Sequence, residues 1–343
     1  MGGMSTEHDV SVVSGMSVLK NINQEKYEVF PICINKQGKW YQYKGEYHTL
    51  SLEVGDSLNN LEEIKNVFDF LKRMDIVFPV LHGLYGEDGT IQGLLELLQI
   101  PYVGCRVLAS SVAMDKVYTK ILLNQAGIKQ ANYLYIRKKE NQYYHITENF
   151  EESILHLEKD CKWIVSKLGL PLFVKPSNSG SSVGIRKVNS QQELISAIDY
   201  AAQFDSKILL EQNIEGLELE CAVLGTNQLE CSCVGQITPA EEFYSFEAKY
   251  KNQESKLTIP AQISKEESEK IREIAKKAFR TIDGSGLARV DFFLQKESGQ
   301  IILNEINTMP GFTSISMYTK LWEKTGKSYS QIIEELIELA KKE

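Results

Sequence analysis

The first candidate site is a set of oxygen-bearing side chains near the C-terminal end of the chain. Arg289-Val-Asp291 and Asn304-Glu-Ile-Asn307 lie in two apolar segments that have the composition of buried strands. Residues i and i+2 of a strand share a face, so pairing of these strands would bring Asp291, Glu305 and Asn307 together. Two carboxylates and an amide suit Mg²⁺, which also takes oxygens from substrate phosphates. A carboxylate in a strand is more often on the surface, but a buried one needs a partner, and we therefore favour a metal site.

A lysine followed by a loop rich in glycine and serine forms the second candidate site. In Phe173-Val-Lys-Pro-Ser-Asn-Ser-Gly-Ser-Ser-Val-Gly184, Lys175 ends a predicted strand. Backbone N–H groups near Gly180 and Gly184 can turn toward phosphate oxygens, and the lysine adds a positive charge. The two common nucleotide fingerprints, GxxxxGK[ST] and GxGxxG after a strand, are absent from the sequence. Taken alone, this pattern is as consistent with an ordinary solvated loop as it is with a phosphate-binding loop.

A third segment, residues 241–255, is aromatic and charged and lies between predicted strands. A long stretch without periodicity is often a lid over an active site. A loop without a role is the alternative interpretation.

Hydrophobic periodicity predicts the elements that must position these groups. Helices are predicted at Val10–Ile22, Leu61–Leu71, Thr90–Leu98, Met114–Gly127, Gln191–Ala202, Ser264–Thr281 and Ser328–Lys342. Strands are predicted at Lys26–Ile34, Ile76–Leu81, Leu172–Lys175, Ile208–Gln212, Leu219–Leu224, Cys231–Ile237, Gly286–Leu294 and Ile301–Glu305. Residues 137–165 show helical stretches. The alternation in the first third of the chain predicts an open parallel sheet, and the fold class is α/β, or α+β, overall.

Composition excludes several classes of protein. The chain has 343 residues, with 46 acidic against 38 basic side chains and a formal net charge of -8. These values exclude a disordered chain and disfavour a protein whose main partner is nucleic acid or an anionic membrane. No apolar run approaches the length of a membrane span. The six scattered cysteines lack zinc-site spacing and indicate free thiols, so we expect a cytoplasmic protein.

Three parts are predicted, with boundaries that give 1–114, 115–209 and 210–343. At the N-terminus, Gly2-Gly3 forms a turn leading into a helix, yet only Met1 precedes it. Such a turn usually follows a strand, so we expect the first strand of the N-terminal sheet to be missing.

Seven motifs in order make the sequence resemble the D-alanine–D-alanine ligase family of ATP-grasp enzymes. They are Ser5-Thr-Glu-His-Asp-Val-Ser11, Leu81-His-Gly-Leu-Tyr-Gly-Glu-Asp-Gly-Thr90, Met114-Asp-Lys116, Phe173 to Gly184, Glu247-Ala-Lys-Tyr250, Gly286-Leu-Ala-Arg-Val-Asp291 and Asn304 to Ser314. The resemblance implies an ATP-grasp fold, a Rossmann-like N-terminal domain with an apolar first strand, and ligation of two D-alanines through an acyl phosphate for peptidoglycan synthesis.

The resemblance also implies roles at matching positions. For ATP they are Lys116, Lys175 and Lys249 at the phosphates, with Glu211 at the adenine and Glu218 at the ribose. Asp291, Glu305 and Asn307 would hold two Mg²⁺ ions, with Mn²⁺ as an alternative. Arg289 and the N–H of Gly311 would stabilise the oxyanion, and Ser316 with the N–H of Met317 would hold the second substrate's carboxylate.

Glu7 would bind the first substrate's ammonium, tied through Ser181 and Tyr250 to the lid. His82 is either a proton relay at the substrate or a structural hydrogen-bonding residue. The intact Tyr250 resembles dipeptide-forming members, whereas members that form D-alanyl-D-lactate replace it. A D-alanine–D-serine ligase and an inactive nucleotide-binding relative remain alternatives, the latter because of the missing strand. A homodimer is a further expectation from the resemblance.

Overall fold

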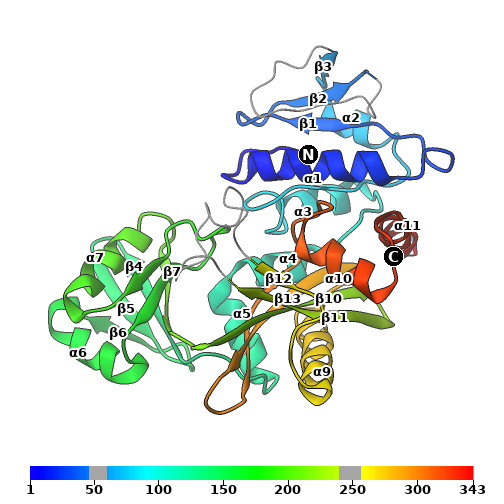
Figure 1. Cartoon of the computed structure of the whole chain (residues 1–343). Coiled ribbons are helices and arrows are strands. Elements are labelled where there is room, and N and C mark those ends of the chain that lie inside the picture. The colour runs from blue at the N-terminus through cyan, green and yellow to red at the C-terminus, as the bar shows by residue number, and fades with distance from the viewer. Residues whose placement is uncertain (46–59, 239–255, 343) are drawn as a thin grey trace.

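The computed structural model describes residues 1–45, 60–238 and 256–342 and contains three β-sheets with helices packed on them (Figure 1). The helices are α1 His8–Asn21, α2 Val67–Leu71, α3 Thr90–Leu98, α4 Val107–Met114, α5 Lys116–Gln125, α6 Leu157–Leu168, α7 Gln191–Ala201, α9 Lys265–Thr281, α10 Met317–Thr325 and α11 Tyr329–Ala340. The mixed α/β class predicted from the sequence is confirmed.

The N-terminal part contains β1 Ile32–Ile34, β2 Trp40–Tyr43 and β3 Leu61–Glu63, which pair antiparallel in the order β1-β2-β3. Of the open parallel sheet predicted for this part, the described residues show two isolated parallel bridges, Gly2 with Ile34 and Val77 with Tyr102. The first of these is flanked by hydrogen bonds from Ile34 N to Met1 O and from Gly3 N to Ile34 O. Residues 1–3 therefore lie beside β1 as a short strand would.

The predicted helix at Leu61–Leu71 is wrong for its first half. Leu61–Glu63 forms β3 because it pairs with β2, and the helix α2 begins only after Asn66, whose side chain accepts from Asp69 N. Of the helical stretches predicted within residues 137–165, one is present as the start of α6 from Leu157. Most of the earlier residues form strands instead, which aromatic and β-branched side chains favour.

The central part is a six-stranded antiparallel sheet in the order β6-β5-β4-β9-β7-β8. Its strands are β4 Tyr133–Lys139, β5 Gln142–Ile146, β6 Glu152–Leu155, β7 Leu172–Pro176, β8 Arg186–Val188 and β9 Lys207–Gln212. Helices α6 and α7 cover this sheet, and Figure 1 shows them at its outer side. Buried Ile164 of α6 and Ile198 of α7 pack with Ile136 and Leu210 of the strands.

The C-terminal part is a five-stranded antiparallel sheet in the order β12-β11-β10-β13-β14. Its strands are β10 Gly216–Gly225, β11 Leu229–Thr238, β12 Lys256–Thr258, β13 Leu287–Gln295 and β14 Ile301–Asn307. Alternation places Cys221 and Val223 in the core against α9, whereas Ala222 and Leu224 pack with α10 and α11 on the other face. Figure 1 shows α11 beside α1, which brings the N-terminal part to this second face.

Local signals explain the helix starts. The predicted Ser328-to-Gln331 capping box is present at α11, and Ser264 with Glu267 forms another at α9.

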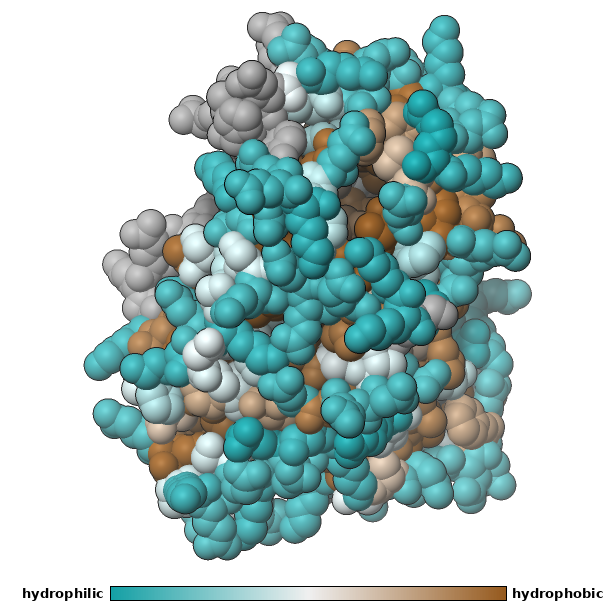
Figure 2. All heavy atoms as spheres, turned by 90° about the vertical axis from the view of Figure 1, so that its right-hand side faces the viewer, coloured by the Kyte–Doolittle hydropathy of each residue, from teal (hydrophilic) through white to brown (hydrophobic). Residues whose placement is uncertain are grey.

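The six cysteines are free thiols. Hydrophilic side chains cover most of the face in Figure 2, and apolar ones show there in separate groups. Among the described helices, none has the length and apolar character needed to cross a membrane.

Candidate active site

A row of acidic side chains crosses three strands of the five-stranded sheet. Glu220 of β10 lies opposite Asp291 of β13, which lies opposite Glu305 of β14. In the neighbouring row, Arg289 lies opposite Asn307. Directly opposite residues of an antiparallel pair share a face, so the strand pairing on which the metal prediction depends is present. Their face is the one that α1, α10 and α11 approach.

Arg289 organises this row. Its Nε donates to Asp291 Oδ1 and its terminal nitrogen to Oδ2, both at 2.7 Å, and Nε lies 3.0 Å from Glu220 Oε2. Burial disfavours the charged guanidinium, but Asp291 and Glu220 outweigh it and hold the pKa of Arg289 well above its usual value. The sequence reasoning missed Glu220, although its i+2 spacing from Glu218 was a usable signal.

The donor atoms fit a hard cation in kind. No three His, Cys, Asp or Glu side chains of the described residues are close enough to hold an ion by themselves. The Asn307 amide, whose Nδ2 lies 3.0 Å from Asp291 Oδ2, would have to complete a set with Asp291 and Glu305. Each oxygen of Asp291 already accepts from Arg289, so a bound ion would share this carboxylate with the guanidinium.

Two lysines converge on Glu211, which lies at the end of β9. Lys175 of β7 pairs with its Oε2, and Lys120 of α5 lies 2.5 Å from its Oε1. Burial raises the pKa of Glu211, but the two lysines more than offset this and bring it to about 2. The sequence reasoning missed Lys120, which follows Lys116 by one helical turn on the same α5 face.

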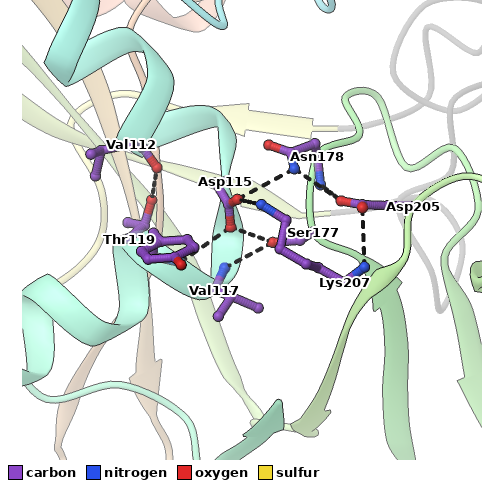
Figure 3. Close-up of polar contacts among 9 residues, drawn as sticks. Val112, Asp115, Val117, Thr119, Ser177, Asn178, Asp205 and Lys207 are labelled. Atoms are coloured by element: carbon purple, nitrogen blue, oxygen red, sulfur yellow. Dashed lines mark hydrogen bonds and ion pairs between the residues drawn. The ribbon is translucent and has the colours of Figure 1, made fainter. Parts of the chain in front are cut away.

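The glycine-serine loop is anchored to the start of α5 (Figure 3). Asp115 caps α5 by accepting from Tyr118 N, and it also accepts from Ser177 Oγ at 2.5 Å and pairs with Lys207. Asn178 donates its backbone N–H to Asp205 at 2.9 Å. These contacts fix the first residues of the loop.

Lys116, at the first position of α5, donates from Nζ to Ser179 O at 2.6 Å. Two of the predicted ATP lysines, Lys116 and Lys175, therefore lie at the two ends of the anchored loop segment.

The same loop reaches the start of α1. A Cβ added at Gly180 would lie 2.2 Å from Glu7 Oε1, so only glycine leaves room for this carboxylate. Glu87, which lies within the Leu81–Thr90 motif, accepts from Gly83 N at 2.6 Å. Burial of its carboxyl and the nearby negative charge of Glu7 raise the pKa of Glu87 to about 8.

His82 connects the N-terminal part to the loop after β14. Its Nδ1 lies 3.0 Å from Met309 O and its Nε2 lies 2.8 Å from Ser14 Oγ. A carbonyl only accepts, so these partners assign the proton to Nδ1 and let Ser14 donate to Nε2. Burial lowers the pKa of His82 to about 4. Both ring nitrogens are engaged with protein, which favours the structural alternative over the proton relay.

Ser316 precedes α10 and folds the same loop onto itself. Its Oγ accepts from Thr313 N at 3.1 Å, and an added Cβ at Gly311 would lie 3.1 Å from it. Met317 begins α10, where its backbone N–H is one of the helix's unpaired donors. These three predicted residues are thus close together, as a carboxylate-binding turn requires.

The remaining predicted residues are placed less completely. Ser181 follows Gly180 in a left-handed conformation with φ 46°, and Glu218 lies on β10 two residues before Glu220. Lys249 and Tyr250 lie outside the described residues, as does the whole predicted lid segment, residues 241–255.

The site combines three features: lysines beside an anchored glycine loop, a row of carboxylates around Arg289, and the carboxylate of Glu7 from the N-terminal part. Together with two antiparallel sheets, these features are typical of one class of enzyme, the ATP-grasp ligases. The description "D-ala D-ala ligase N-terminus" matches residues 1–105 and "D-ala D-ala ligase C-terminus" matches residues 122–338. The chain belongs to the D-alanine–D-alanine ligase family.

Curated relatives and solved structures agree with this membership. The D-alanine–D-alanine ligase of Acetivibrio thermocellus is 48% identical over 99% of this chain and 94% of its own length. D-alanine–D-alanine ligase B of Clostridium tetani is 50% identical over 99% of this chain and 91% of its own length.

Among solved structures, the VanG D-Ala:D-Ser ligase of Enterococcus faecalis is 37% identical with a TM-score of 0.84, covering 99% of this chain and 97% of its own. The D-alanine–D-alanine ligase of Coxiella burnetii is 31% identical with a TM-score of 0.82, covering 99% and 92%.

Proposed function

We propose that this protein is a D-alanine–D-alanine ligase, which uses ATP to join two D-alanines for peptidoglycan synthesis. The curated relatives that match nearly the whole chain carry this activity in their names. The geometric observation that supports it best is the contact between Glu7 and Gly180. It brings a carboxylate suited to a substrate ammonium against the loop suited to ATP phosphates.

Joining a carboxylate to an amine requires a leaving group on the carboxylate. Transfer of a phosphoryl group from ATP to the first D-alanine supplies it, and the amine of the second D-alanine then displaces phosphate. The protein must neutralise phosphate charge, stabilise the tetrahedral oxyanion and orient two small zwitterions. Lys116 and Lys175 serve the first need, and Arg289 with the Gly311 N–H serves the second.

Substrate orientation falls to residues from both ends of the chain. Glu7 holds the first ammonium, supported by Ser181, and Ser316 with Met317 N–H holds the second carboxylate. We assign Glu211 and Glu218 to the nucleoside, and Lys249 and Tyr250 to the lid. When bound at Asp291, Glu305 and Asn307, two Mg²⁺ ions, or Mn²⁺, supply charge neutralisation at the phosphates. His82 stabilises the loop after β14 through its hydrogen bond to Met309 O.

D-Serine is the second candidate for the second substrate, because the VanG D-Ala:D-Ser ligase has a very similar structure. A hydroxymethyl in place of a methyl asks for only small changes in a pocket near Met317. Tyr250 supports an amine rather than D-lactate as acceptor.

The direct test supplies the protein with ATP, Mg²⁺ and D-alanine, then with D-alanine plus D-serine or D-lactate. Phosphate is measured and the product is identified by mass. We expect D-alanyl-D-alanine as the main product. Absence of phosphate release with every pair would refute the ligase activity, and D-alanyl-D-lactate as the sole product would refute the role given to Tyr250.

We also propose a cytoplasmic location, a homodimer and three domains at 1–114, 115–209 and 210–343. Strand β9 crosses the second boundary and belongs entirely to the central sheet. Its end carries Glu211, so this boundary runs through the proposed nucleotide site.

A further inference from the structure

Lys120 is a buried lysine to which no role has been given so far. Only 3% of the residue is exposed, and Lys120 Nζ lies 2.5 Å from Glu211 Oε1 and 5.3 Å from the centre of the Tyr133 ring. A buried ammonium is costly unless a negative charge lies next to it. The carboxylate of Glu211 supplies that charge, so the two buried residues form one unit.

Glu211 is paired on both sides, because Lys175 contacts its other oxygen. Lys175 is also one of the lysines that we assign to the ATP phosphates. A lysine drawn toward a phosphate can no longer neutralise Glu211 fully. Lys120 lies between Glu211 and Tyr133, so it would remain beside the carboxylate if Lys175 moved toward a phosphate.

We propose that Lys120 is a positioning residue that keeps Glu211 ionised and aimed at the nucleobase, and so makes the site select a 6-amino purine over a 6-oxo purine. The inference rests on the proposed function, in which Glu211 faces the base.

The selection follows from hydrogen-bonding chemistry. An ionised carboxylate only accepts, so it matches the amino group of adenine and opposes the carbonyl of hypoxanthine. A buried carboxylate that loses its counter-charge takes up a proton and can then donate to that carbonyl. Lys120 therefore determines which of the two bases Glu211 can bind.

The test compares ATP and ITP binding to the full chain with Mg²⁺ by isothermal titration calorimetry. Lys120→Met should lower the ATP-over-ITP preference about tenfold or more, the scale of one charge-assisted hydrogen bond. Lys120→Arg should retain most of the preference. Lys327→Met is the matched control, because Lys327 pairs with Glu230 and Glu335 away from this site. If Lys120→Met does not fold, Lys120→Gln carries the same prediction.

A double-mutant cycle separates positioning from a general electrostatic effect. Glu211→Gln should itself lower the preference, because an amide both donates and accepts, and Lys120→Met should lower it no further in that background. An unchanged preference in Lys120→Met, or an equal loss with and without Glu211, would overturn the inference. Nucleotide binding is measured without D-alanine, so failure of the ligase assay leaves this test intact.

Discussion

Gly180→Ala tests the proposed active site with a minimal change. The new Cβ would lie 2.2 Å from Glu7 Oε1, whereas ordinary contact begins near 3.4 Å. The carboxylate must therefore move by about 1.2 Å. Because Gly180 is not among the residues with positive φ and the clash is with the end of a flexible side chain, we expect little loss of stability.

The expected loss is in catalysis. A displacement of about 1 Å at a substrate-positioning group can cost about 100-fold in rate, which corresponds to about 2.7 kcal/mol. We therefore expect kcat/KM for D-alanine to fall about 100-fold in a coupled ADP-release assay. The nucleotide affinity should change far less, because Glu7 belongs to the amino-acid side of the site.

Gly93→Ala is the matched control. Gly93 lies within α3, and an added Cβ there meets no atom within 4 Å. Alanine should stabilise this helix by up to about 1 kcal/mol without affecting activity. Wild-type kcat/KM in Gly180→Ala, in a protein whose thermal midpoint matches that of wild type, would refute the placement of Glu7 at the substrate.

Three further predictions test other parts of the site. Glu305→Gln should abolish turnover and leave the thermal midpoint within about 2 °C of wild type, since the amide has the shape of the carboxylate and Glu305 is only half-buried; near-normal activity would contradict the metal assignment. Ser14→Ala should destabilise the fold by about 1–3 kcal/mol in urea, because His82 and the Phe312 N–H lose a buried partner; an unchanged midpoint would argue against that link. Glu87 binds its proton more tightly when folded, so its contribution to stability is complete below about pH 4.5, declines as pH rises and is lost above about pH 8. Glu87→Gln should remove this decline from the urea stability profile, and an identical profile would contradict the raised pKa.

Local patterns in the sequence determined much of this protein. Strand alternation predicted that Arg289 shares a face with Asp291, and that Glu305 shares a face with Asn307. The capping box at Ser328 was predictable because it involves contacts within one helical turn. Such signals depend only on neighbours in the chain, so they can be recognised without knowledge of the fold. The seven motifs and their order along the chain indicated the family.

The partners of these residues were decided by the tertiary structure. Lys120 meets Glu211, Arg289 meets Glu220, and His82 meets Met309, which is 227 residues away. No local pattern encodes such contacts, because they arise when sheets and helices pack and bring distant segments together. For the same reason Leu61–Glu63 became a strand: pairing with β2 outweighed its helical periodicity. The sequence thus determined which chemical groups the protein carries, and packing determined their partners, burial and charge states.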